Sequence, residues 1–521
     1  MKKHLHILTA TILILLTVLS CKSEKEQDVK KPNILFIMSD DHTSQAWGIY
    51  GGILKDYVKN KSISRLADEG IILNNAFCTN SICVPSRASI LTGQYSNKNG
   101  VYTLSDALQP DSLNIAKVLS ENGYQTALIG KWHLKKEPSG FDHYNILHDQ
   151  GRYWDPILRT KKNFHKPPEA WDVHKGFSTD VITQLSLNWL SQRDKEKPFM
   201  LMTHFKATHE PFDYPKRFDD LYKDIEIPEP VSLFDFSPET TGRSFPGQQL
   251  ENLSWRYEQA SNDPEKWWCK YPGLPFYTKN MDSITARKAT YQKFVKDFLR
   301  SGAAIDDNIG KILDYLETSG LAQNTIVIYT ADQGYFLGEH GFFDKRLIYD
   351  ESLRMPFVIR YPKEVPAGKR LDDIILNIDF PALFADYAGV KIPESMQGES
   401  FRNNLKGETP EHWRTSVYYR YWTNHPVRPG HFGIRNKRYK LALFYGQSLD
   451  MTGSSKESTA PAWEFYDLEK DSHENYNAYH DESYSDIIKD MKLELIKLRE
   501  EYEDTDEKYT VLQDIFDKYW N

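Results

Sequence analysis

Residues 32–41 read PNILFIMSDD, an apolar run that opens on a proline and closes on two carboxylates. An unbroken apolar run of strand length is typical of a strand that is buried on both faces, as in the parallel sheet of an α/β protein. The strand is therefore expected to end at Asp40 and Asp41. Two acidic side chains then lie at its carboxyl end.

Three further apolar runs are each followed within a few residues by polar or ionisable groups. In chain order, the expected helices and strands cover residues 112–122 (helix), 125–130 (strand), 178–192 (helix), 199–205 (strand), 286–321 (helix) and 325–330 (strand). We expect the third helix to break near Gly302. The alternation indicates a doubly wound α/β sheet, whose active site lies beyond the carboxyl ends of the strands.

The remaining segments have a different texture. Residues 71–77 are a further candidate strand. Residues 212–285 are rich in Pro, Asp, Trp and Tyr with little periodicity, so we expect them to run over the surface, either as a structural insertion or as a segment that shapes a substrate site. After about residue 410 the runs become short and aromatic, which indicates a smaller antiparallel sheet closed by a charged helix at 485–502. The predicted catalytic domain is 32–409, and an α+β subdomain follows over 410–521.

Composition narrows the class of protein. The chain has 521 residues, of which 40% are hydrophobic and 26% charged, as in a globular protein with a substantial core. The net charge of −8 and the pI near 6.1 argue against a nucleic-acid partner. A local basic pocket for an anionic ligand remains compatible with both values.

The first 21 residues have the pattern of an export signal. Lys2 and Lys3 precede an apolar run, 7–19, that is too short to predict a transmembrane helix. The ending VLSC resembles a bacterial lipobox, in which Cys21 is lipidated; the alternative is an ordinary cleaved signal whose cysteine is incidental. We expect a lipid-anchored protein with a flexible tether over 22–31, exported to the periplasm or the outer membrane of a Gram-negative bacterium and without other membrane contact.

Residues 83–93 read CVPSRASILTG and place a thiol, a rigid proline, a hydroxyl and a guanidinium within five residues. A helix-like run follows, and its free N-terminal amides favour an anion. A lone cysteine in such a turn is more often a small buried hydrophobe than a nucleophile. With Cys21 set aside, Cys78, Cys83 and Cys269 are an odd number of thiols, so no disulfide framework and no zinc spacing is implied.

Oxygen ligands follow two strands that we expect to be neighbours. Asp40 and Asp41 end the first strand, and Asp332 and Gln333 end another. A single Asp after a strand is usually a cap or turn residue. Two such pairs on converging strands are the ligand set of a hard cation such as Ca²⁺ or Mg²⁺.

The sequence also offers cations and proton carriers for this predicted site. They are Arg87, Lys131, His133, His209 and Lys345. An anionic ester bound against a metal needs charge-assisted donors on its free oxygens, and its leaving oxygen needs an acid. His209 is the candidate acid, whereas Lys345 could equally be a solvated loop charge.

Together these motifs resemble the type I sulfatases of the alkaline-phosphatase superfamily. The resemblance runs from about residue 32 to 361, and the C-terminal FYDL at 465–468 and HEN at 473–475 are similar to that family's small domain. The matching residues are Asp40, Asp41, the CVPSR of 83–87 with LTG at 91–93, GKWH at 130–133, His209, DQG at 332–334, GEHG at 338–341, and Lys345.

The resemblance implies a mechanism. Cys83 would be oxidised to formylglycine (3-oxoalanine) by a maturation enzyme, and the hydrated aldehyde would be the nucleophile. By the same resemblance, one Ca²⁺ would be held by Asp40, Asp41, Asp332 and Gln333, with residue 83 as a further metal ligand. Many relatives carry Asn or His in place of Gln333. The resemblance also implies that Arg87 and Lys131 orient residue 83, and that His133 acts in the expulsion of sulfate. Lys345 and His209 would contact the sulfate and protonate the leaving oxygen.

The expected substrate is a sulfated carbohydrate, glycosaminoglycan-like or algal. Candidate sugar contacts are Arg152, Tyr153, Trp154, His174, His425, Arg428 and His431, for each of which structural packing is at least as good an account. Two alternatives stay open: a phosphodiesterase or phosphonate hydrolase of the same superfamily, and a catalytically silent lipoprotein that binds sulfated glycans.

Overall fold

The structure is a computed structural model that describes residues 30–234 and 246–520. From Pro32 onward these residues belong to one compact unit. The expected signal, the lipidated Cys21 and nearly all of the tether lie outside the described residues. Within the described ranges, no helix has the length and apolar character needed to cross a membrane.

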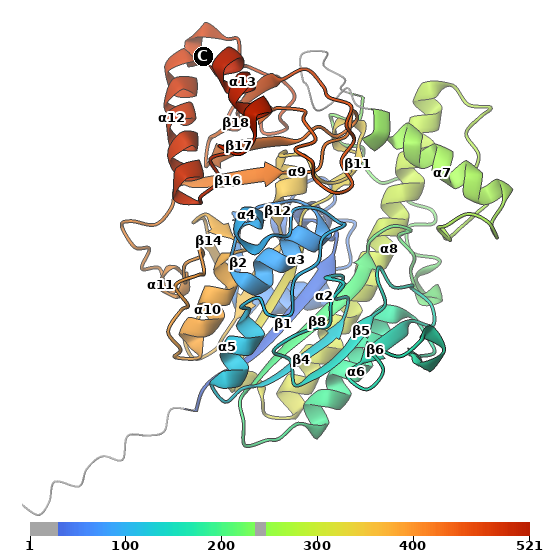
Figure 1. Ribbon diagram of the computed structural model, residues 1–521. Helices are drawn as coiled ribbons and strands as arrows, with labels where there is room; N and C mark the ends of the chain where they lie inside the picture. Colours follow the sequence, from blue (N-terminus) through green and yellow to red (C-terminus); the bar gives the residue numbers. More distant parts are fainter. Residues whose placement is uncertain (1–29, 235–245, 521) are drawn as a thin grey trace, which may run out of the picture. The chain divides into compact units, whose positions relative to one another are not determined.

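A ten-stranded mixed sheet lies at the centre of the fold (Figure 1). Its five middle strands, from β9 to β5, are parallel, and β13, β6 and β7 add antiparallel pairs toward the edges. In spatial order the strands are β14 (Lys369–Leu371), β2 (Ile71–Leu73), β13 (Phe357–Arg360), β9 (Thr325–Ala331), β1 (Asn33–Asp40), β8 (Phe199–Thr208), β4 (Gln125–Gly130), β5 (His143–Leu147), β6 (Ile157–Thr160) and β7 (Asp172–Val173). The predicted α/β sheet is confirmed, with antiparallel strands at its margins.

Helices cover both faces of this sheet because β1 is apolar on both sides. Phe36 and Met38 pack in one hydrophobic cluster, and Leu35 and Ile37 pack in the other. The helices of the first face are α3 (Cys83–Thr92), α5 (Ile115–Glu121) and α10 (Asp379–Tyr387); those of the second are α2 (Lys61–Asp68), α6 (Ser178–Gln192) and α8 (Ser283–Thr318).

Short elements connect these layers. They are β3 (Ala76–Phe77), α4 (Ser96–Asn99), β10 (Phe336–Leu337), β11 (Phe343–Asp344), α9 (Asp350–Leu353), β12 (Arg354–Met355), β15 (Ile375–Leu376) and α11 (Arg402–Leu405). The candidate strand at 71–77 is thus two strands, β2 and β3, in different sheets.

The expected break at Gly302 was wrong, because α8 runs without interruption for 36 residues. The glycine serves packing instead. A Cβ at position 302 would lie 2.9 Å from Nε2 of His42, whose ring is buried between the helix and the sheet. Glycine lowers the helix propensity of its position. A glycine inside a helix can therefore mark a point where two elements pack closely.

The expectation that residues 212–285 lie over the surface was wrong in part. This segment contains α7 (Leu250–Asn262), which lies beside α8 (Figure 1). Phe212, Tyr257 and Tyr271 are buried in a third hydrophobic cluster, together with Phe294 and Phe298 of α8. Isolated aromatic anchors at irregular spacing make this core, so no periodic pattern announces it.

The C-terminal residues form the predicted small antiparallel sheet. Its strands are β16 (Ser416–Tyr421), β17 (His431–Asn436), β18 (Tyr439–Phe444) and β19 (Ala462–Asp467), and its helices are the expected α12 (Ser485–Glu501) and an unpredicted α13 (Thr510–Tyr519). The sheet packs against the loop before α3: Tyr419 Oη accepts from Ser81 N at 3.2 Å, and Arg420 N donates to Thr79 O at 3.2 Å. The domain boundary near residue 410 stays a prediction.

Candidate active site

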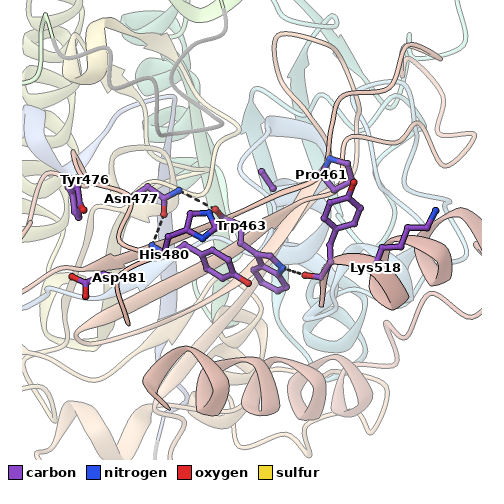
Figure 2. A pocket seen from close by; sticks show the side chains of 10 residues that line it. Pro461, Trp463, Tyr476, Asn477, His480, Asp481 and Lys518 are labelled. Atoms are coloured by element: carbon purple, nitrogen blue, oxygen red, sulfur yellow. Dashed lines mark hydrogen bonds between the residues drawn. The ribbon is translucent and has the colours of Figure 1, made fainter. Parts of the chain in front are cut away.

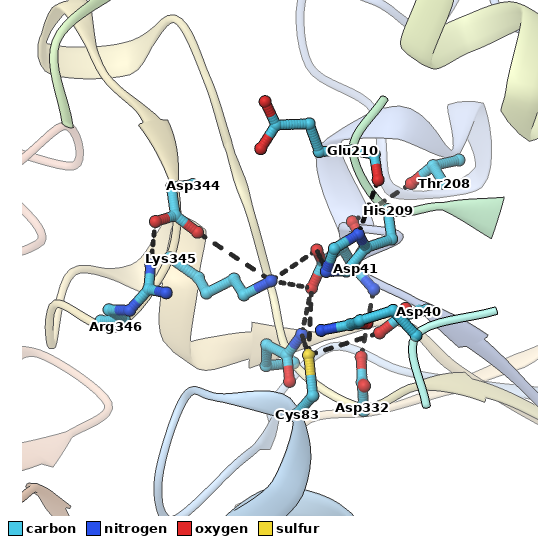
Figure 3. A network of polar contacts seen from close by, with 12 residues as sticks. Asp40, Asp41, Cys83, Thr208, His209, Glu210, Asp332, Asp344, Lys345 and Arg346 are labelled. Atoms are coloured by element: carbon cyan, nitrogen blue, oxygen red, sulfur yellow. Dashed lines mark hydrogen bonds and ion pairs between the residues drawn. The ribbon is translucent and has the colours of Figure 1, made fainter. Parts of the chain in front are cut away.

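Three buried carboxylates meet where β1 and β9 end. The parallel register pairs Ser39 with Ala331, so Asp40, Asp41 and Asp332 leave the sheet side by side. Asp41 has a left-handed backbone, and its N–H donates to Asp332 Oδ1 at 3.1 Å. One oxygen from each acid lies within 4.8 Å of the others (Figure 3).

This arrangement fits a hard cation. Burial raises the pKa of Asp332 to about 7 and also raises the pKa of Asp41, and a bound cation would favour the charged form of both acids. Gln333 lies beside them: its Nε2 donates to Asp41 Oδ1, and its buried Oε1 has no hydrogen-bond partner among the described residues, so exchange of the amide's nitrogen and oxygen would turn an oxygen toward the acids. Carboxylate and amide oxygens are the ligands that Ca²⁺ prefers. The structure thus brings together the four predicted ligands; the identity of the ion stays a prediction.

Cys83 is the first residue of α3 and points at the acids (Figure 3). Its Sγ lies 3.4 Å from Asp40 Oδ1 and 4.0 Å from Asp41 Oδ1. Burial raises the pKa of the thiol to about 12, so it is protonated at neutral pH and is a poor nucleophile as a thiol. The position therefore suits a residue that acts in another chemical form.

Arg87 and Lys131 pair with the acids from below the cavity. Arg87 Nε donates to Asp332 Oδ2 at 2.9 Å, and its Nη1 donates to the Lys131 carbonyl at 2.9 Å. Lys131 Nζ donates to Asp40 and, at 2.6 Å, to Gln150 Oε1. Burial would raise the pKa of Asp40, but Lys131, His209 and Arg87 together hold it well below its usual range.

Lys345 and His209 approach from the opposite side. Lys345 Nζ donates to both oxygens of Asp41, at 2.6 and 2.5 Å, so it is a site residue and not a solvated loop charge. The His209 ring is fixed by Nδ1, 2.8 Å from Glu210 O, and its Nε2 lies 3.8 Å from Asp41 Oδ2 (Figure 3). Burial holds the pKa of His209 well below its usual value, and an anionic ester beside it would favour the protonated form.

His133 is set back from the open side of the site. It follows β4 in a left-handed conformation, is 6% exposed, and does not line the cavity. Its Nε2 is 3.6 Å from the Asp149 carboxylate, and its Nδ1 has no hydrogen-bond partner among the described residues. Burial, followed by the charge of Lys131, keeps its pKa well below the usual value, so the ring is a neutral proton acceptor.

A cavity of about 660 Å³ opens at Asp41, Cys83, His209 and Lys345. Most of the charged residues around it are basic, which suits an anionic ligand. The basic residues that line it are Arg152, Lys206, Arg256, Lys270, Lys345, Arg346 and Arg428, against the acids Asp41, Glu210, Asp213 and Asp344.

Lys206 is a cavity residue that the sequence reasoning missed. It belongs to β8 and is 3% exposed, and among the described residues its Nζ has no ion-pair or hydrogen-bond partner. The ring of Tyr153 is its nearest recorded contact, 4.9 Å from Nζ to the centroid. A lysine inside an otherwise apolar strand, three residues before His209, was the available signal.

The predicted sugar contacts divide into two groups. Arg152, Tyr153, Trp154 and Arg428 line the cavity, whereas His174 and His425 are not among its lining residues. His431 was wrong as a sugar contact. Its side chain faces inward from β17 and is fully buried. The ring stacks on Phe444 with centroids 4.5 Å apart, and Nδ1 lies 2.8 Å from Pro429 O.

A second hollow, of about 800 Å³, lies over β19 and α13 (Figure 2). Its polar groups serve the local backbone: Trp463 Nε1 donates to Tyr519 O at 2.6 Å, and Asn477 Nδ2 donates to Trp463 O at 3.1 Å. It holds no cluster of acids or nucleophiles comparable to the first cavity, so the chemistry belongs to the site at Cys83.

Comparison with known proteins agrees with this geometry. The sulfatase family model matches residues 32–390, and a model described as N-sulphoglucosamine sulphohydrolase, C-terminal, matches residues 338–501. The chain belongs to the sulfatase family. The predicted resemblance is confirmed, and the chain is an enzyme of the sulfuric ester hydrolase class.

Individual sulfatases show how far the likeness extends. An N-acetylglucosamine-6-O-sulfatase of Bacteroides thetaiotaomicron is 37% identical over 96% of this chain and 92% of its own. A solved structure of BT4656 in complex with its substrate D-glucosamine-2-N,6-O-disulfate is 36% identical, with a TM-score of 0.82 over 92% of this chain and 99% of that one. A phosphonate monoester hydrolase of Agrobacterium radiobacter, at 18% identity and TM-score 0.69 over 91% of this chain and 96% of its own, shows a shared fold alone.

Proposed function

We propose that this sulfatase removes the 6-O-sulfate from glucosamine-type residues of a sulfated, glycosaminoglycan-like saccharide. The observation that carries the proposal is the 660 Å³ cavity, which joins the acid cluster and Cys83 to a basic and aromatic wall. The 37% identical relative is an N-acetylglucosamine-6-O-sulfatase, and the 36% identical structure holds its substrate D-glucosamine-2-N,6-O-disulfate; both support this choice over an algal saccharide.

The chain's own residues account for binding and proton transfer. Lys345 places its ammonium group in the cavity beside Asp41, where it would donate to an oxygen of a bound sulfate, and Lys131 holds Asp40. His209 exposes Nε2 to the cavity and is positioned to protonate the leaving sugar oxygen. Arg87 holds Asp332 and the Lys131 backbone, and so positions the ligand oxygens.

The bound Ca²⁺ would polarise the sulfate and neutralise charge that develops on its oxygens. Asp40, Asp41, Asp332 and Gln333 are the residues that would hold it. Without a cation, burial keeps the pKa of Asp332 raised, and a divalent ion would favour its charged form.

Cys83 would act after a maturation enzyme has replaced its CH₂SH group with an aldehyde. The buried, protonated thiol next to carboxylates is a poor thiolate, which supports a nucleophile of oxygen chemistry at this position. His133, a neutral base after β4, is the residue proposed to remove the proton that accompanies release of sulfate.

Mass spectrometry of the peptide that spans residue 83 tests the modification. Protein coexpressed with a formylglycine-generating enzyme is expected to show the mass of the aldehyde, and protein made without it the mass of cysteine. Fully active enzyme with unmodified cysteine would contradict the mechanism.

Sulfate release from defined sugars tests the substrate. We expect turnover of glucosamine-6-O-sulfate and N-acetylglucosamine-6-O-sulfate, and no release from 4-O-sulfated galactosamine or from the matched 6-phosphates. Preference for an ulvan-type sulfate or for a phosphate ester would overturn the proposal.

From the leader alone we also propose export and lipid attachment at Cys21. Metabolic labelling with a fatty-acid analogue is expected to mark the wild type and not the Cys21→Ala variant.

A further inference from the structure

Two tryptophans, one within α7 and one shortly after it, have large exposed fractions. Trp268 is 66% exposed and Trp255 is 52% exposed. Only the first of the two lines the catalytic cavity, beside Cys269 and Lys270. Leaving a large aromatic side chain in water forgoes the stabilisation of burial, so such a ring at the edge of a binding cavity is a candidate contact for a ligand.

The chain on either side of Trp268 is firmly held. Cys269 and Tyr271 are buried, at 5% and 6% exposure, and the Tyr271 hydroxyl donates to the Glu210 carboxylate. Tyr271 also packs edge-on against the buried ring of Tyr257 in α7, with centroids 4.7 Å apart. The exposed indole is therefore presented from an anchored backbone, which limits the entropy lost when it binds.

Arg256 supports the indole from the cavity side. Its Nη1 donates to both oxygens of Glu210, at 3.0 and 2.8 Å, which orients the guanidinium. The guanidinium carbon lies 5.9 Å from the centroid of a Trp268 ring and 5.1 Å from that of Phe343. Glu210 follows His209, so the supported rim is continuous with the group proposed to protonate the leaving oxygen.

We propose that Trp268, supported by Arg256, forms a subsite for the sugar next to the one that loses its sulfate. The inference rests on the proposed function. A pyranose presents a face of C–H groups that packs on an indole, while its hydroxyls stay in water, which is the environment of a half-exposed ring. The ligand class is an oligosaccharide, whose terminal residue fills the cavity and whose second residue stacks on Trp268.

The test compares two substrates in the wild type and three variants. kcat/KM is measured for glucosamine-6-O-sulfate and for a tetrasaccharide that ends in the same residue, with wild type, Trp268→Ala and Trp255→Ala. Trp255 is the matched control because it is also exposed but lies outside the cavity lining. We expect Trp268→Ala to lose about tenfold in kcat/KM on the tetrasaccharide, mostly in KM, with less than twofold change on the monosaccharide. Trp268→Phe is expected to retain most of the affinity.

The outcomes separate the inference from the function on which it rests. Equal losses on both substrates, no loss on either, or the same loss in Trp255→Ala would overturn the subsite. Failure of the wild type to release sulfate from the monosaccharide would instead overturn the proposed function. In that case quenching of tryptophan fluorescence by the tetrasaccharide, present in wild type and reduced in Trp268→Ala, still decides whether the rim binds saccharide.

Discussion

Lys206 carries a charge that the folded chain does not compensate. The residue is 3% exposed and lines the cavity, and in the described part of the chain its ammonium group has no carboxylate as an ion-pair partner. Burial, together with the nearby Lys131, lowers its pKa to about 8. A buried charge without a partner is costly, and it persists in proteins where function requires it.

We expect Lys206→Met to raise stability and lower activity. Below pH 8 Lys206 is charged in both the folded and the unfolded wild type. The unfolded chain, with a lysine pKa of about 10.4, holds this charge more easily, so the charge lowers the free energy of unfolding by on the order of 3 kcal/mol. The wild type gains stability as the pH rises from about 8 to 10, so the variant's advantage in Tm is largest at pH 7 and closes over that range.

In the same variant, kcat/KM for the sulfated sugar is expected to fall at least about tenfold, because a charged hydrogen bond to the substrate is lost. Lys270→Met is the control, since Lys270 Nζ already donates to Pro264 O. A variant that is less stable at pH 7 and fully active would show that Lys206 is only structural.

Gln333 is the proposed ligand on which the cation site is most easily tested. Its Oε1 is a buried acceptor with no partner among the described residues, whereas Gln150 Oε1 accepts from Lys131. Gln333→Leu is expected to weaken Ca²⁺ binding by about tenfold or more, as loss of a ligand or its support does. The measurement is the rise in Tm when Ca²⁺ is added to chelator-treated protein. Gln150→Leu is expected to keep the full rise; equal behaviour of the two variants would remove Gln333 from the site.

At the scale of the element, the site depends on where β1 and β9 end and on where α3 begins. The parallel pairing of β1 with β9 brings Asp40 and Asp332 together, and α3 begins at Cys83 itself. Opposite faces of β1 belong to separate hydrophobic clusters, so a helix must pack closely on each side. On the second face that helix is α8, and it packs on His42 through Phe298 and Gly302.

Gly302→Ala is expected to destabilise the protein although alanine favours helix. The added methyl group would lie 2.9 Å from His42 Nε2, and the ring cannot move because it packs on Trp47 at 4.5 Å and Nδ1 lies 3.3 Å from the Tyr329 hydroxyl. Overpacking of this kind costs about 1–3 kcal/mol, more than the gain of about 1 kcal/mol in helix propensity.

The matched control lies two turns further along the same helix. At Gly310 an added methyl group would meet only Ser62 Oγ, at 2.7 Å, and a half-buried hydroxyl can rotate away. Gly310→Ala is expected to leave the free energy of unfolding unchanged or raise it. Chemical denaturation measures both variants, and the reverse order of stabilities would refute this account of Gly302.

At the scale of the whole molecule, the small sheet completes the structure around the site. Arg435 of β17 donates to Asp350 of α9 at 2.8 Å, and Lys440 of β18 donates to the same carboxylate at 2.8 Å. Burial would raise the pKa of Asp350, but Arg435 and Lys440 hold it well below the usual value. This buried network joins the C-terminal sheet to the segment that carries Lys345.

Asp350→Asn is expected to lower the free energy of unfolding by about 3–5 kcal/mol, because the buried Arg435 loses its carboxylate partner and the buried Lys440 keeps only Glu474, at 2.6 Å. Since the folded pKa lies below the unfolded value of about 3.9, the stabilisation is complete above about pH 4 and is lost as the pH falls toward the folded pKa. The difference in Tm between wild type and variant is therefore expected to be constant from pH 8 to 5 and to narrow below pH 4.

Asp314→Asn provides the comparison, since Asp314 is 71% exposed and, within the described ranges, its ion-pair partner is Arg65 at the surface. Its loss is expected to change Tm little at any pH. A small effect of Asp350→Asn at neutral pH would show that the two parts of the fold are held together by apolar packing alone.

The sequence by itself determined the α/β class, the strands that end at Asp40 and Asp332, and the residues of the sulfatase site, because continuous apolar runs and local motifs report short-range requirements. It also identified the C-terminal sheet. Only the tertiary structure decided that Lys345 pairs with Asp41, that His431 is buried away from the cavity, and that α8 passes unbroken through Gly302. Contacts between residues far apart in the chain depend on the packing of whole elements, and no local pattern encodes that Trp268 lines the cavity whereas Trp255 does not.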